Sequence, residues 1–125
     1  MLRWRPRNGN AHRAHLTLAR RFLLVVVLAA TGTWSYVPGT DHGPTGVTGR
    51  SAPADFYLPG TDAGALISSL DYKTFAPVGA GTTVTIPKGQ ALRLLMNDAR
   101  GDQGATGFDD NTGELAVQWT VESCQ

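Results

Sequence analysis

Residues 114–122 (ELAVQWTVE) alternate between large apolar side chains and small or polar ones. The odd positions from Leu115 to Val121 are all apolar, and the even positions carry residues suited to water. A period of two over this length predicts a half-buried antiparallel strand with its odd positions facing inward. A strand with one apolar face needs a second layer to cover it, so this segment predicts a layered β structure.

Three further segments have the character of strands. Residues 82–86 (TTVTI) set Val84 and Ile86 against threonines, and residues 91–96 place Leu92, Leu94 and Met96 on one face. Residues 63–67 (AGALI) fit a small apolar strand or a single helical turn. No stretch after residue 30 keeps a helical period over three turns. In a chain of 125 residues with 15 glycines, this favours one all-β domain, a sandwich or a barrel.

The N-terminal part is basic and then strongly apolar. Residues 1–21 carry six arginines and no acid, which predicts a basic tail. The apolar run from Phe22 to Ala30 resembles the core of a secretory signal, and the small residues up to Gly32 resemble its cleavage site. Its valines at 25, 26 and 27 suit a buried strand equally well. Residues 22–32 are therefore either a signal or the first strand of the domain, and the run is too short for a membrane-spanning helix.

The charge of the remaining chain restricts its partners. From residue 22 onward there are five basic and ten acidic residues, a net charge of −5. A net-acidic body argues against nucleic acid as a partner. The single cysteine, Cys124, allows no disulfide within the chain.

Half of the acidic residues lie in or next to one turn-rich segment, residues 97–113. Asp98, Asp102, Asp109 and Asp110 fall within it, and Glu114 follows directly. Two interpretations fit this composition. Such a segment is a solvated turn, because Asp, Asn and Gly are common turn residues, or it binds a hard cation such as calcium through its oxygens.

Other motifs were weighed against simpler explanations. The spacing does not match an EF-hand, because Arg100 and Thr120 occupy positions where that loop needs oxygen ligands. The tripeptide at 100–102 (RGD) is too short to be specific. Asp98 and Asp110 could be proposed as the acid and base of a glycoside hydrolase, but nothing in the sequence indicates which of them would have the raised pKa that the acid needs.

Five short segments occur in a telling order along the chain. They are 34–36 (WSY), 43–46 (GPTG), 64–67 (GALI), 92–98 (LRLLMND) and 110–113 (DNTG), followed by the alternating strand. Together they resemble the PA-I-type galactophilic lectins, calcium-dependent bacterial proteins with a galactose-binding-domain-like β-sandwich or jelly-roll fold. The resemblance covers residues from about 29 to 121 and implies that 33–125 is a lectin-like β-sandwich domain.

The resemblance implies a calcium ion held between two loops, with sugar hydroxyls completing its coordination. The positions that match its ligands are Tyr36, through its backbone carbonyl, with Asp98, Gly107, Asp110 and Asn111. All supply hard oxygen ligands. The expected sugar-binding residues are Tyr36, Asp41, His42, Asp55, Asp98 and Asp110.

Two departures from the family pattern affect this expectation. The segment between Asp98 and Asp110 is longer than in the family, and it contains two extra acids. The family also uses a histidine and a glutamine to bind galactose, and the corresponding positions fall near Ala52 and Asp55. Alanine has no hydrogen-bonding side chain, so the galactose preference is not expected to carry over unchanged.

The sequence thus predicts a calcium-dependent carbohydrate-binding module that is not an enzyme. The alternative is a secreted structural or accessory sandwich that has lost sugar binding. The expected location is outside the cell or in its envelope if residues 22–32 are a signal, and the cytoplasm if they are a strand. The expected partner is a carbohydrate, with no nucleic acid and no stable membrane span, and a homo-oligomer is compatible with the sequence.

Overall fold

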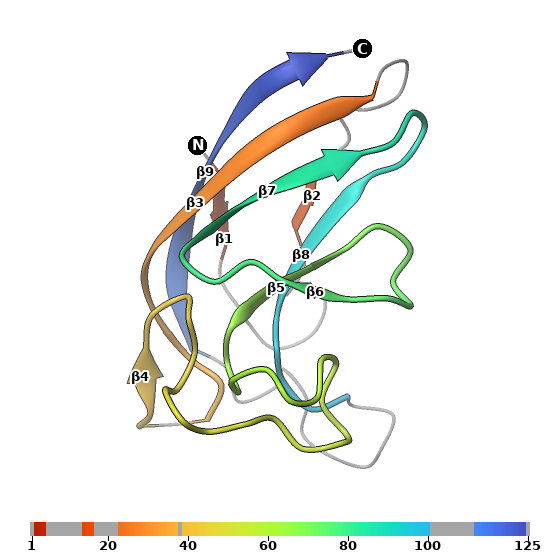
Figure 1. Cartoon of the computed structure of the whole chain (residues 1–125). Coiled ribbons are helices and arrows are strands. Elements are labelled where there is room, and N and C mark those ends of the chain that lie inside the picture. The colour runs from red at the N-terminus through yellow and green to blue at the C-terminus, as the bar shows by residue number, and fades with distance from the viewer. Residues whose placement is uncertain (1, 5–13, 17–22, 38, 101–111, 125) are drawn as a thin grey trace.

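The predicted all-β antiparallel sandwich is confirmed in a computed structural model of the chain, which describes residues 2–4, 14–16, 23–37, 39–100 and 112–124. These residues form two antiparallel sheets packed against each other (Figure 1). Among them, no helix is long and apolar enough to cross a membrane.

The first sheet is built around one long strand. β3 (Leu24–Ser35) pairs along its whole length with β9 (Thr112–Cys124), and β1 (Leu2–Trp4) extends the sheet beyond β9. On the other side of β3 lie β7 (Gly81–Ile86), opposite its first half, and β4 (Asp41–His42), opposite its last two residues. A register shift between Val25 and Val26 marks a β-bulge near the start of β3.

The second sheet has the strand order β2, β8, β5, β6. These strands are β2 (Ala14–Leu16), β8 (Leu92–Met96), β5 (Leu66–Ser69) and β6 (Ala76–Pro77). In the apolar segment 63–67, Leu66 and Ile67 belong to β5, and no helical turn forms in this segment.

The core lies between the sheets, where the apolar faces of the central strands meet. Along β3, alternate residues from Leu24 to Ala30 are buried, as expected for a strand with one face on the core. Leu92 through Met96 supply most of the opposing side, each except Arg93 fully buried. Trp34 is the largest side chain that is almost completely enclosed.

The predicted alternation of buried and exposed side chains is confirmed for most of β9. Leu115 and Val117 are completely buried and Trp119 is half-buried, whereas Val121 is 40% exposed. The inward position of Val121 was therefore predicted wrongly. The C-terminal end of β9 projects past the second sheet, which no longer covers it there (Figure 1).

The N-terminal segments take part in both sheets. The apolar run had two alternative interpretations, a secretory signal and a domain strand. In this structure residues 24–35 form the strand β3. Within the stretch expected as a basic tail, β1 pairs with β9 and β2 pairs with β8. Cleavage of residues 1–32 as a signal remains a prediction, and it would remove four buried core side chains of β3, those of Leu24, Val26, Leu28 and Ala30.

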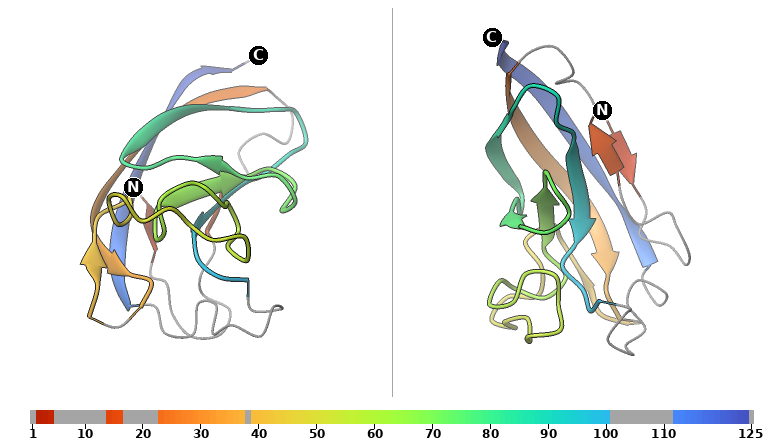
Figure 2. Two further views of the ribbon diagram at one scale, coloured as in Figure 1. Left: turned by 60° about the horizontal axis from the view of Figure 1, so that its bottom comes forward. Right: turned by 90° about the vertical axis from the view of Figure 1, so that its right-hand side faces the viewer.

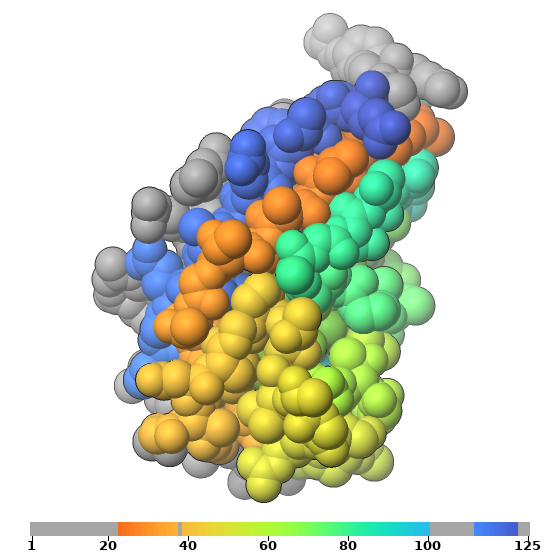
Figure 3. Space-filling view, turned by 60° about the vertical axis from the view of Figure 1, so that its left-hand side comes forward, coloured from red at the N-terminus to blue at the C-terminus, as the bar shows by residue number. Residues whose placement is uncertain are grey.

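The loops that matter for function gather at one end of the sandwich. This end is opposite the C-terminal end of β9, and it contains β4, the segment 43–65 and the residues after β8 (Figure 2). In the space-filling view, the segment 43–65 (yellow to yellow-green) packs over this end below β3 and β7 (Figure 3).

Candidate functional site

The candidate site is assembled at this loop end from strand termini that are far apart in sequence. Tyr36 directly follows β3, and Asp98 follows β8 by two residues. Between them in sequence runs the segment 43–65, whose backbone hydrogen bonds repeatedly join it to itself and to residues 97–100. The two strands therefore bring one side chain from each sheet to the same set of loops.

Asn97 fixes the segment 58–62 to the end of β8. Its side chain is completely buried, and its Oδ1 accepts the N–H of Leu58 at 2.9 Å. Its Nδ2 donates to the carbonyl of Leu58 at 2.9 Å, with longer contacts to the carbonyls of Thr61 and Asp62. Its backbone N–H donates to Ala65 and its carbonyl accepts from Gly64, both at 2.7 Å. One buried amide thus satisfies the backbone of a loop that makes no regular sheet pairing there.

Asp98 is the only predicted carboxylate ligand in the described part of the chain that is buried, at 4% exposed. Its Oδ1 accepts the N–H of Ala99 at 2.7 Å, and its carbonyl accepts the N–H of Tyr57 at 3.1 Å. A carboxylate at this depth requires compensating partners or a metal ion, because burying its charge is costly. Its position and chemistry are compatible with the calcium ligand that the sequence predicts.

Tyr36 is buried in a small aromatic cluster. Its ring lies edge-on to that of Phe56, with centroids 6.1 Å apart, and 5.7 Å from the ring of His42. Its hydroxyl accepts a hydrogen bond from Nη1 of Arg50 at 2.9 Å. Phe56 also forms a backbone bridge with Ala99, next to Asp98. Phe56 thus joins the residues after β3 to those after β8.

His42 and Asp41 lie beside this cluster in β4. The Nδ1 of His42 lies 3.0 Å from the carbonyl of Gly43, and its half-buried ring covers Gly64. A Cβ on Gly64 would approach the His42 ring to 2.3 Å, and the backbone there has φ +82°. Glycine is therefore required on both counts. The side chain of Asp41 is exposed, opposite Ser35 in the pairing of β3 with β4.

Asp55 lies on the other side of Phe56, close to the residues after Asp98. It is half-buried, and its carbonyl accepts the N–H of Arg100 at 2.9 Å. The guanidinium carbon of Arg100 lies 5.8 Å from the centroid of the Tyr57 ring, an arrangement that favours a cation–π interaction. The Nε of Arg100 is buried without a hydrogen-bond partner.

The remaining predicted ligands, Gly107, Asp110 and Asn111, lie outside the described residues. The described residue that follows them, Thr112, pairs with Ser35, which directly precedes Tyr36. Within the described ranges, no group of three or more histidine, cysteine, aspartate or glutamate side chains is gathered as a metal site. The described part supplies the Tyr36 carbonyl and the Asp98 carboxylate, and both fit a calcium ligand set by chemistry.

Ala52 lies in the region where the resemblance leads one to expect a sugar-binding histidine. It is 6% exposed. Its N–H donates to Thr61 at 2.9 Å and its carbonyl accepts from Gly60 at 3.0 Å. Neither its methyl group nor its backbone is available to a sugar.

The sequence did not identify Asn97, Phe56 or Arg50 as parts of this site. Their roles depend on contacts between distant residues, such as the bond between Asn97 and Leu58, which are 39 positions apart. The only available signal was a polar amide directly after a run of buried apolar residues, since such a side chain needs hydrogen-bond partners wherever it is enclosed.

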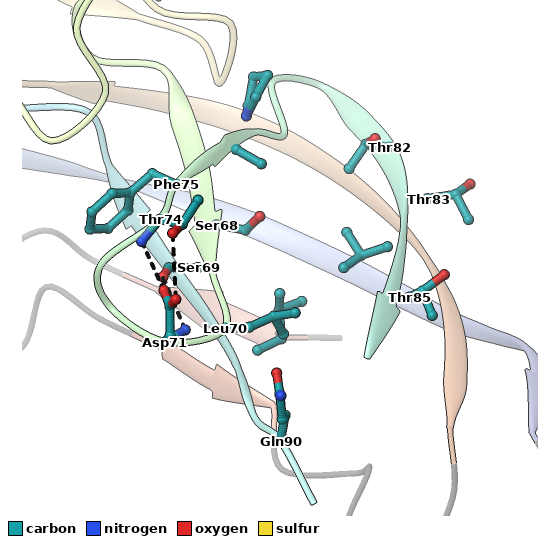
Figure 4. Close-up of a pocket in the computed structure, with 14 residues that line it drawn as sticks. Ser68, Ser69, Leu70, Asp71, Thr74, Phe75, Thr82, Thr83, Thr85 and Gln90 are labelled. Carbon is teal, nitrogen blue, oxygen red and sulfur yellow. Dashed lines mark hydrogen bonds between the residues drawn. The ribbon is translucent and has the colours of Figure 1, made fainter. Parts of the chain in front are cut away.

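A separate hollow of about 470 Å³ lies elsewhere, between β7 and the segment 68–77 (Figure 4). Asp71 organises its rim. The backbone N–H of Thr74 and then that of Lys73 donate to its carboxylate, which lowers its pKa. The side chain of Thr82 points toward the hollow and those of Thr83 and Thr85 point away from it (Figure 4). None of the predicted site residues lines this hollow, so its size alone does not relocate the candidate site.

The comparisons with known proteins support the fold. No protein-family model matches the sequence, and no curated protein matches it. Among solved structures, the chain is similar to the "EclA N-terminal domain; PllA-like lectin". The TM-score is 0.58 and the identity 19%, and the match covers 96% of this chain and 93% of the other. At this identity the similarity shows a shared lectin β-sandwich fold over nearly the whole of both chains.

Proposed function

We propose that this domain binds carbohydrate through a calcium ion at the loop end of the sandwich, in the manner of PA-I-type lectins. The observation that carries the proposal is the link through Phe56. Its ring contacts Tyr36 at the end of one sheet, and its backbone bridges Ala99, the residue after the buried Asp98, at the end of the other. The similarity to a PllA-like lectin domain over most of the chain supports it.

In this proposal, Tyr36 supplies a backbone carbonyl and Asp98 a carboxylate, with Gly107, Asp110 and Asn111 as the further ligands implied by the family resemblance. When bound, calcium would offer its remaining coordination positions to sugar hydroxyls. The protein's own contribution is a rigid support, since Asn97 and the aromatic cluster hold both loops in place. No bond is made or broken.

Thermal unfolding tests the metal. With free calcium at about 100 times its Kd, binding to the folded state alone adds about 2.7 kcal/mol of stability, a clear rise in Tm. The rise should disappear with a chelator and in Asp98→Asn, and it should persist in Asp71→Asn, which neutralises a fully exposed aspartate of another loop. If adding calcium left Tm unchanged, the calcium site would be refuted.

A second candidate, an accessory module without sugar binding, is favoured by the enclosed methyl of Ala52 where the family has a histidine. A glycan array with calcium present separates the two candidates. Calcium-dependent binding to any glycan supports the lectin. A calcium-dependent Tm together with a silent array supports the accessory module.

A further inference from the structure

Two arginines flank the candidate site, one on each of its loops. Arg50 is exposed and reaches the hydroxyl of Tyr36, and Arg100 follows Asp98 and packs against Tyr57. Both are tied to Phe56: its ring contacts Tyr36, and its backbone bridges the residue before Arg100. The two cations therefore belong to the same part of the surface as the buried Asp98.

The backbone under each arginine is fixed. The N–H of Arg50 donates to Val47 at 3.0 Å, and its carbonyl accepts from Ala63 at 2.8 Å. The N–H of Arg100 donates to Asp55 at 2.9 Å. Side chains that start from an anchored backbone and rest on an aromatic residue lose less conformational freedom when a ligand binds.

The guanidinium groups are not used in ion pairs within the described part of the chain. The one hydrogen bond of the Arg50 side chain there is to the neutral hydroxyl of Tyr36. Arg100 contacts the face of the Tyr57 ring, and its Nε has no partner. Because a guanidinium has five N–H donors, the described residues use only a small part of this capacity.

We infer that the site selects an anionic sugar, one carrying a carboxylate or a sulfate, and that Arg50 and Arg100 recognise its charge. Guanidinium forks match the geometry of these anions, and the resulting charge-assisted hydrogen bonds are stronger than neutral ones. Arg50 lies two positions before Ala52, so this loop offers a charged donor close to where the family's neutral donor is missing. The inference deepens the proposed function and rests on it for the location of the sugar.

Isothermal titration with matched sugar pairs tests the inference. The probes are D-galactose with D-galacturonic acid and D-glucose with D-glucuronic acid, each with calcium and again with a chelator. We expect the acid of at least one pair to bind about tenfold more tightly or better than its neutral form, a preference that weakens as salt rises. Arg50→Gln and Arg100→Gln should each reduce this preference severalfold. Arg50→Lys keeps the positive charge but lacks the planar guanidinium, so its preference for the acid should lie between those of the unaltered protein and Arg50→Gln.

Lys88→Gln is the matched control, because it removes the same charge from an exposed turn at the end of β7. It should leave the preference unchanged. Equal binding of the acid and neutral forms by the unaltered protein would overturn the inference. So would a preference that survives both arginine substitutions, since the carboxylate would then be recognised elsewhere, for instance by the metal.

The calcium-dependent Tm distinguishes the two levels of the proposal. A Tm that responds to calcium, with no preference for acids, overturns the inference and leaves the calcium site intact. An arginine-dependent preference that persists in chelator, with no calcium effect on Tm, supports the inference and refutes the calcium site.

Discussion

Replacing Asn97 with alanine should destabilise the whole domain, because this side chain connects a long loop to β8. The substitution removes two hydrogen bonds of 2.9 Å to the backbone of Leu58, together with two longer contacts to the carbonyls of Thr61 and Asp62. At about 1 kcal/mol net for each good bond, the direct loss is about 2 kcal/mol. Backbone groups left without partners near the half-buried Leu58 raise the expected cost to about 2–4 kcal/mol.

Urea unfolding followed by circular dichroism measures this cost directly, and the same change should lower Tm by about 10 °C. Asn97→Asp is a second variant, which keeps the acceptor for the N–H of Leu58 but turns a carboxylate oxygen toward carbonyls. It should be at least as destabilising. The control is Gln90→Ala, an exposed amide on another turn, with an expected change below about 0.5 kcal/mol. If Asn97→Ala were as mild as this control, Asn97 would not be what holds the loop.

The remaining predictions concern the central strand, one glycine and one carboxylate. Leu28→Ala should cost about 2–5 kcal/mol of unfolding free energy because Leu28 is 1% exposed. Val27 beside it is 38% exposed, so Val27→Ala should cost less than about 1 kcal/mol. Similar costs for the two variants would contradict the placement of β3 in the core. Gly64→Ala should be about 1–3 kcal/mol worse than Gly60→Ala, because both have positive φ but only a Cβ at 64 meets the histidine ring. The pKa of Asp71 is lowered by the backbone N–H groups of its turn, so its stabilising effect exists above the unfolded pKa and is lost as pH falls through the folded pKa. Asp71→Asn should therefore be less stable than the unaltered protein near neutral pH and converge with it in acid, as measured by urea unfolding at each pH.

The strands were predictable where one face of a strand is buried and the other exposed. In β7, Ile86 is fully buried and Val84 half-buried, while Thr83 and Thr85 are exposed, as the alternation indicated. Such a pattern is local, so the sequence records it directly. The prediction failed at Val121, because how far the opposing sheet extends is not encoded in the strand itself.

The N-terminal strand could not be assigned from sequence for a physical reason. A continuous apolar run serves a signal and a buried strand equally well, and only its partners decide between them. In the structure, β3 has β9 on one side and β7 and β4 on the other. The very short β4 and β6 likewise exist only through pairing with longer strands, and no local pattern marks them.

The sequence indicated candidate ligands but not the residues that support them. Tyr36 and Asp98 were proposed as ligands because they directly follow strand-like segments in a recognisable order. Arg50 was not identified, because a lone arginine in a turn-rich loop gives no sign of which residue it will reach. Its contact with Tyr36 spans 14 positions and depends on how the loop between them folds.

In our proposal, Asn97 has a structural role and its neighbour Asp98 a ligand-binding role at the same strand end. Side chains of consecutive residues in an extended chain point to opposite sides. Asn97 is turned toward the segment 58–62, which it holds through its amide, whereas the carboxylate of Asp98 contacts the start of its own following loop. Substitutions at the two positions should therefore have different signatures: Asn97→Ala lowers stability with or without calcium, and Asp98→Asn removes the stabilisation that calcium adds. A common signature for both would mean that the calcium response reflects general folding rather than binding at Asp98.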